Sequence, residues 1–103
     1  MPQILQSKAA ACDLDEIWDY IAIENHNPTA AMQLIDEFSG TYMQLAANPG
    51  MGQRVERLSQ DLRRFPVRTN YIIFYEPIPD GILIVRVLHA ARNITKDMFE
   101  LDD

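Results

Sequence analysis

The sequence has 103 residues and a formal net charge of −6, so we predict one acidic domain spanning residues 1–103. The overall sign argues against tight, nonspecific binding of nucleic acid, because such binding depends on many contacts to phosphate groups. Cys12 is the only cysteine, which excludes an internal disulfide, and we expect neither a metal nor a cofactor. The sequence shows neither a start typical of a signal peptide nor a long apolar run, so we expect a cytoplasmic protein.

The chain begins with a pattern typical of a short strand followed by a helix. Gln3–Gln6 suits a strand at the edge of a sheet, and Ser7 can cap a helix that begins at Lys8. Apolar side chains then recur at the spacing of one helix face, at Leu14, Ile17, Trp18 and Ile21. We interpret this face as core and the acids between its members as a solvated face.

A second helix is predicted after a break at residues 25–28. Asn27 can cap this helix, and Pro28 suits its first turn, where a missing N–H costs nothing. The helix stops at residues 48–50, and its apolar stripe comprises Ala31, Leu34, Ile35, Phe38, Tyr42 and Leu45. Two amphipathic helices joined by so short a link predict an antiparallel helix hairpin.

The second half of the chain is typical of a small sheet. Met51–Asp61 is polar and is interpreted as a loop, and Leu62–Val67 as a strand whose Pro66 favours an edge or a strand end. Tyr71–Tyr75 and Ile82–Leu88 are apolar runs separated by prolines and Asp-Gly, which indicates a hairpin. The second run is apolar at nearly every position, as expected of a central strand.

After the last strand, Asn93 can cap a short helix with Ile94, Met98 and Leu101 on one side. The element order is therefore β-α-α-β-β-β with a short C-terminal helix. We predict an α+β fold in which the N-terminal helix hairpin packs on a mainly antiparallel four-stranded sheet.

One group of side chains could carry chemistry: Arg63, Arg64, Arg68, Arg86 and Arg92, with His89 and Tyr71. Arginines that stabilise developing phosphorane charge and a histidine that transfers a proton could cleave RNA. In the alternative interpretation, Arg86 and Arg92 pair with acids such as Glu76 or Asp97, and His89 is satisfied at a sheet edge. Spacing alone favours this structural alternative.

The sequence resembles the ParE toxins of the RelE/ParE superfamily over nearly its whole length. The similar blocks occur in the same order and spacing: Asp13–Ala22, Asn48–Gly52, Leu62–Val67, Tyr71–Tyr75 and Arg86–Arg92. The last block, Arg-Val-Leu-His-x-Ala-Arg, is the most specific. The resemblance implies the toxin of a type II toxin–antitoxin pair, bound and neutralised by a ParD-like antitoxin. Typical ParE proteins inhibit DNA gyrase, whereas the RelE branch cleaves messenger RNA on the ribosome.

Three features favour the ParE branch and a non-enzymatic toxin. The chain is acidic, although ribosome binding favours a strongly basic protein. The link after the second helix lacks the lysines expected of RelE toxins, and Met98 and Phe99 stand where a catalytic tyrosine is expected. Two positions depart from the ParE pattern, with Glu76 where an arginine is common and Asn93 where an aspartate is common.

The resemblance and the charge pattern together assign roles to particular residues. The predicted target contacts are Arg63, Arg64, Arg68, Arg86 and Arg92. The predicted antitoxin contacts are Leu14, Trp18, Tyr20 and Tyr42. The expected assembly is a hetero-oligomer with the antitoxin, which alone would contact DNA.

Two alternatives remain open from the sequence. One is a ribosome-dependent ribonuclease that uses Arg63, Arg86, His89 and Arg92. The other is an inactive family member kept for its complex with the antitoxin.

Overall fold

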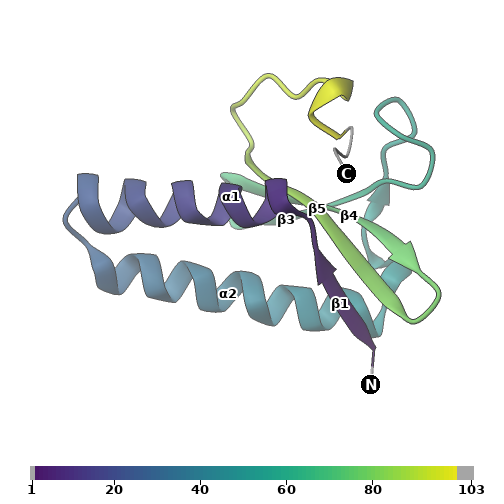
Figure 1. Cartoon of the computed structure of the whole chain (residues 1–103), viewed down its shortest axis with the longest axis horizontal. Coiled ribbons are helices and arrows are strands. Elements are labelled where there is room, and N and C mark those ends of the chain that lie inside the picture. Colours follow the sequence, from purple (N-terminus) through teal and green to yellow (C-terminus); the bar gives the residue numbers. More distant parts are fainter. Residues whose placement is uncertain (1, 100–103) are drawn as a thin grey trace.

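A helix hairpin covers one face of a five-stranded mixed sheet (Figure 1). The computed structural model describes residues 2–99. Its helices are α1 (Lys8–Trp18), η1 (Asp19–Glu24), α2 (Pro28–Ala47), η2 (Pro49–Met51) and η3 (Lys96–Phe99). Its strands are β1 (Gln3–Gln6), β2 (Gln53–Arg54), β3 (Arg63–Val67), β4 (Tyr71–Ile78) and β5 (Gly81–His89). The predicted α+β fold with a helix hairpin is confirmed.

The strands lie in the order β1-β5-β4-β3-β2. β1 runs parallel to β5, and all other neighbours are antiparallel, so β3, β4 and β5 form a meander. β4 and β5 are buried at five of eight and six of nine residues, respectively, and make up the centre of the sheet. No helix within residues 2–99 has the length and hydropathy that a membrane crossing requires.

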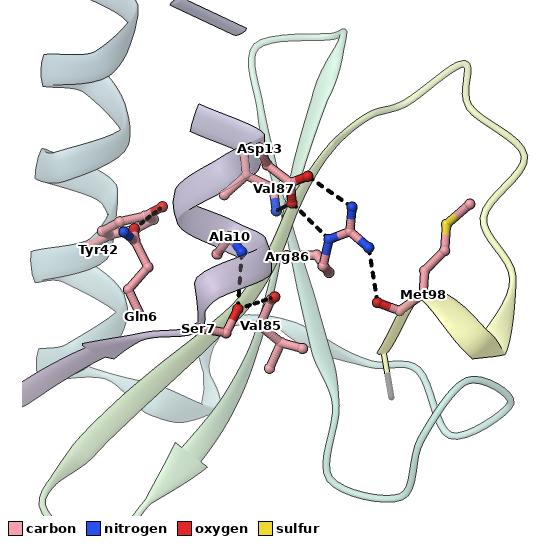
Figure 2. Close-up of polar contacts among 9 residues, drawn as sticks. All are labelled: Gln6, Ser7, Ala10, Asp13, Tyr42, Val85, Arg86, Val87 and Met98. Atoms are coloured by element: carbon pink, nitrogen blue, oxygen red, sulfur yellow. Dashed lines mark hydrogen bonds and ion pairs between the residues drawn. The ribbon is translucent and has the colours of Figure 1, made fainter. Parts of the chain in front are cut away.

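Ser7 joins the edge strand to the first helix and to the centre of the sheet. Its Oγ accepts a hydrogen bond from the N–H of Ala10 at 3.0 Å, as expected of a helix cap. The same hydroxyl donates to the carbonyl of Val85 at 2.7 Å (Figure 2). The predicted cap is confirmed, and its second bond anchors the start of α1 on β5.

The helix hairpin has the predicted link and caps. Asn27 Oδ1 accepts from the N–H of Ala30 at 3.1 Å, and Pro28 occupies the first turn of α2. The chain stays helical after α1, because the π-helical segment η1 follows Trp18 directly. This extension carries the closed end of the hairpin beyond the sheet (Figure 1).

The sheet has an apolar core on each face. On the helix side, Leu34, Phe38 and Leu45 of α2 pack against Ile73 and Tyr75 of β4. On the other side, the loop after β2 and the segment ending in η3 cover the sheet, and their buried residues meet Ile72, Phe74, Val85 and Leu88. The rings of Phe74 and Phe99 lie 4.8 Å apart in an edge-on arrangement.

The structure differs from the predicted elements in three places. The predicted four-stranded sheet has a fifth strand, β2, which lies in the region interpreted as a loop. The predicted strand Tyr71–Tyr75 extends to Ile78 as β4 and includes Pro77. A proline is tolerated there because β3 pairs with β4 only as far as Tyr75, so no strand on that side needs an N–H from Pro77. The C-terminal helix is a short 3₁₀ turn from Lys96 rather than a helix capped by Asn93, and Leu101 lies outside the described residues.

Candidate functional site

A β-bulge in β5 positions Arg86 toward α1. Phe74 of β4 pairs with Arg86, but the next residue, Tyr75, pairs with Ile84, so β5 holds one extra residue. As a result Ile84 and Val87, three residues apart, both reach the helix-side core. Arg86 lies between them at the junction of β5, α1 and the C-terminal segment (Figure 2).

Asp13 of α1 binds Arg86 in a bidentate ion pair. Arg86 Nε donates to Asp13 Oδ2 and Arg86 Nη2 donates to Asp13 Oδ1, each at 2.8 Å. Asp13 Oδ2 also accepts from the N–H of Val87 at 3.0 Å, and Arg86 Nη1 donates to the carbonyl of Met98 at 3.0 Å (Figure 2). Only 15% of the Arg86 side chain and 5% of the Asp13 side chain are exposed. The hydrogen bonds that Arg86 donates to Asp13 raise the pKa of Arg86, so its guanidinium stays charged.

Arg63 and Tyr75 hold the loop that follows α2. Arg63 Nη1 donates to the carbonyl of Gly52 at 2.6 Å. The hydroxyl of Tyr75 donates to the carbonyl of Pro49 and accepts from the N–H of Gly52, both at 2.8 Å. Gly52 has no room for a side chain, because an added Cβ would lie 2.5 Å from Tyr75 Oη. Arg63 is thus used within the fold.

Arg68 pairs with an acid on α2. Its Nε and Nη2 atoms both lie 3.1 Å from Glu37 Oε1, and the two side chains are about half exposed. Ion pairs at this exposure contribute little to stability because water and salt screen them. Arg68 therefore remains a surface group with a weak partner.

Arg64 and Arg92 line one cleft together with two further arginines. This cleft of about 640 Å³ lies on the sheet face away from α2, and we call it the arginine cleft. Arg54 of β2 and Arg57 of the following loop line it together with Arg64 and Arg92. Arg54 and Arg57 were not among the predicted target contacts. The signal for them was the run of residues 51–75, which has five arginines against two acids.

His89 lies at the end of β5 and is exposed. Its Nδ1 accepts from the N–H of Ala91 at 3.1 Å, and its ring packs edge-on against Tyr71 at 5.4 Å. His89 pairs with Tyr71 and Arg63 with Tyr75. Four residues along β4 correspond to about 13 Å, so Arg63 and His89 lie at different ends of this part of the sheet. His89 and Arg92 line one small cleft, but Arg63 lies away from it, so the four residues of the alternative nuclease site are not gathered at one point.

The predicted antitoxin contacts differ in exposure. Leu14 and Trp18 are half-buried, and Tyr20 is 54% exposed near the closed end of the hairpin. Tyr42 is only 8% exposed, and its hydroxyl donates to Gln6 Oε1 at 3.3 Å (Figure 2). Tyr42 therefore offers little surface to a partner. Ile23, which is 62% exposed beside Tyr20, was not predicted.

Asp13 was also missed, although a signal was present in the sequence. It follows Ala10 by three residues and precedes Ile17 by four, so it lies on the buried face of α1. A carboxylate at such a position requires a partner.

Within residues 2–99, no three histidine, cysteine or carboxylate residues are grouped so that they could hold a metal ion.

Comparison with known proteins identifies the family. A model of the ParE toxins of type II toxin–antitoxin systems, parDE, matches residues 4–94. This chain belongs to the ParE toxin family. Toxin ParE1 of Caulobacter vibrioides is 33% identical over 87 residues, which cover 84% of this chain and 88% of that protein.

A solved structure has the same fold as this ParE chain. The chromosomal ParDE TA system from P. aeruginosa contains a chain that matches with a TM-score of 0.69 at 22% identity. The match covers 86% of this chain and 96% of that chain. In this ParE toxin the helix hairpin lies on one sheet face and the arginine cleft on the other.

Proposed function

We propose that this ParE toxin inhibits DNA gyrase in the cytoplasm and that a ParD-like antitoxin neutralises it. Family membership supports a toxin with an antitoxin partner. The choice between gyrase inhibition and RNA cleavage rests on Arg86. Its guanidinium is bound by Asp13 and Met98 and is mostly buried, so it is poorly placed to stabilise a reacting phosphate.

The remaining nuclease candidates add to this argument. Arg63 bonds to the carbonyl of Gly52, and His89 lies about 13 Å along the sheet from it. A proton-transfer group must lie within hydrogen-bonding reach of the atoms that react with the help of the arginines. The net charge of −6 further disfavours the many phosphate contacts that ribosome binding needs. Inhibition through a protein–protein contact has neither requirement.

Target contact is best supported for Arg64 and Arg92. Arg86 and Arg63 are occupied within the fold, and Arg68 has a partner in Glu37. Arg64 and Arg92 instead line the arginine cleft and make no ion pair within residues 2–99. We therefore narrow the five predicted target contacts to these two.

The exposed apolar surface of the hairpin suits an antitoxin helix. Tyr20 and Ile23 lie on η1 and Met32 on α2, each more than half exposed, and Trp18 lies half-buried beside them in the chain. Exposed aromatic and apolar side chains of this kind are the usual anchors for an amphipathic helix. The antitoxin would lay a helix across this surface and continue as an extended segment along the sheet.

The proposal is tested by expression without antitoxin, with DNA, RNA and protein synthesis followed separately by pulse labelling. Early loss of DNA synthesis is expected, together with inhibition of supercoiling when purified toxin is added to purified gyrase. Adding the cognate antitoxin should restore supercoiling. Early loss of protein synthesis with intact supercoiling would instead support the ribonuclease. The absence of any growth arrest would support the inactive family member.

A further inference from the structure

The arginine cleft gathers positive charge from three separate stretches of the chain. Arg54 comes from β2, Arg57 from the following loop, Arg64 from β3 and Arg92 from the segment after β5. Glu56 is the one acidic residue among those that line the cleft. A net positive cleft on a protein of charge −6 is a local exception, and such clefts attract anionic partners.

These arginines are little used by the fold itself. Arg54 pairs with Glu56 at 3.1 Å, but more than half of each side chain is exposed, so the pair contributes little. Arg57, Arg64 and Arg92 make no ion pair within the part of the chain that the structure describes. Like charges held close together repel one another and do not stabilise a domain. Folding alone therefore gives no reason for their convergence.

The cleft also has an apolar side. The half-buried Ile94 lines it, whereas Ile72, Phe74 and Val55 form its floor and are each at most 8% exposed. A volume of about 640 Å³ has room for several side chains. Guanidinium groups bind carboxylates through two parallel hydrogen bonds, and the exposed part of Ile94 can contact an aliphatic or aromatic side chain. The combination fits an acidic peptide better than bare phosphate.

We propose that the arginine cleft binds a short acidic segment of the target protein, in which Asp or Glu residues flank an apolar side chain. The cleft lies on one sheet face, and the helix hairpin lies on the opposite face. The exposed apolar anchors for the antitoxin are on the hairpin and not at the cleft. Only the source of the segment, the protein that the toxin inhibits, rests on the proposed function. The chemistry of the ligand follows from the cleft alone.

Binding is measured by fluorescence anisotropy with the full chain. The probes are fluorescein-labelled octapeptides in which glutamates flank leucine or phenylalanine, and a single-stranded DNA octamer serves as a nucleic-acid probe. The test variant is Arg64→Gln/Arg92→Gln, and the matched control is Lys8→Gln/Arg68→Gln. The control removes the same charge from exposed positions on α1 and the β3–β4 turn, outside the residues that line the cleft. Circular dichroism checks that both variants are folded.

The proposal expects saturable peptide binding that the test variant weakens tenfold or more and the control weakens less than twofold. An equal loss in both variants would show that binding reflects overall charge and would overturn the proposal. Tighter binding of the DNA octamer than of every peptide would assign the cleft to nucleic acid. The absence of saturable peptide binding would also overturn it.

The source of the segment is tested separately with gyrase and antitoxin. The test variant should lose inhibition of supercoiling and keep its affinity for the antitoxin. Weaker antitoxin binding with unchanged inhibition would assign the cleft to the antitoxin and overturn the proposal. If peptides bind through Arg64 and Arg92 while wild-type toxin leaves gyrase active, the gyrase assignment fails and the acidic-peptide site stands. If wild type and test variant inhibit gyrase equally, the cleft assignment fails and the proposed function stands.

Discussion

The carboxylate of Asp13 holds the guanidinium of Arg86 across the interface between α1 and β5, with two N–O distances of 2.8 Å. The same guanidinium also donates a hydrogen bond to the carbonyl of Met98 and so anchors the C-terminal segment. A charge reversal at Arg86 would therefore abolish toxicity by unfolding the protein, whatever the target. Substitutions at Arg64 and Arg92 test target contact without this complication.

Asp13→Ala is expected to destabilise the protein by about 3 kcal/mol, because it leaves the Arg86 charge buried without its main partner. Urea denaturation measures this cost, with Asp15→Ala on the exposed face of α1 as a control. The double variant Asp13→Leu/Arg86→Met should be less destabilised than the sum of the single substitutions. A cost below about 1 kcal/mol for Asp13→Ala would show that the pair is weak.

Tyr75→Phe is expected to cost about 1–3 kcal/mol, since it leaves the buried N–H of Gly52 without an acceptor. The loop at residues 49–52 should exchange its amide hydrogens faster in this variant. Tyr20→Phe removes a hydroxyl from an exposed tyrosine and serves as the matched control, with an expected change near zero. Equal stability of the two variants would mean that the Tyr75 hydroxyl does not hold the loop.

Glu76 predicts a specific dependence of stability on pH. Burial, with a smaller contribution from Asp61, raises the pKa of Glu76 above its ordinary value of 4.5. The folded state then binds this proton more tightly than the unfolded state, so ionisation destabilises the fold as pH rises through that raised pKa. Glu76→Gln should melt at a higher temperature than wild type at pH 7, and the difference should shrink toward pH 4. Asp61→Asn should reproduce part of the effect, and a difference that grows on acidification would contradict it.

Tyr20→Ala should weaken antitoxin binding at least tenfold while leaving the free energy of unfolding nearly unchanged, because Tyr20 is exposed in the free toxin. Isothermal titration calorimetry with the purified antitoxin measures the affinity. Met43→Ala is the control, since Met43 is 64% exposed on α2 but lies toward its other end. A larger effect at Met43 than at Tyr20 would move the antitoxin to another part of the hairpin.

The helix ends and the central strands could be predicted because their signals are local. Ser7 and Asn27 cap their helices through bonds to residues three positions away, and β4 and β5 are apolar runs bounded by turn residues. β2 could not be predicted, since its two residues are polar and exposed and only their pairing with Arg63 and Arg64 makes them a strand.

The candidate sites were harder to predict because their members are distant in the sequence. Arg86 and Asp13 are 73 residues apart, and spacing near Arg86 pointed to Glu76 or Asp97 instead. The arginine cleft brings Arg92 together with Arg64, which is 28 residues earlier in the sequence. Charge patterns showed which residues are basic, but only the fold shows which of them converge.

The parallel pairing of β1 with β5 determines when the domain can assemble during synthesis. The first strand emerges from the ribosome early, but its neighbour in the sheet ends at His89. Ser7 likewise bonds to a residue 78 positions away. Such long-range pairing must close a long stretch of chain, and the loss of chain entropy precedes the contacts that compensate for it. The pairing therefore forms late and slowly. A nascent chain that ends before His89 lacks part of β5, the strand against which both helices pack. The toxin can therefore fold completely only after β5 has been synthesised.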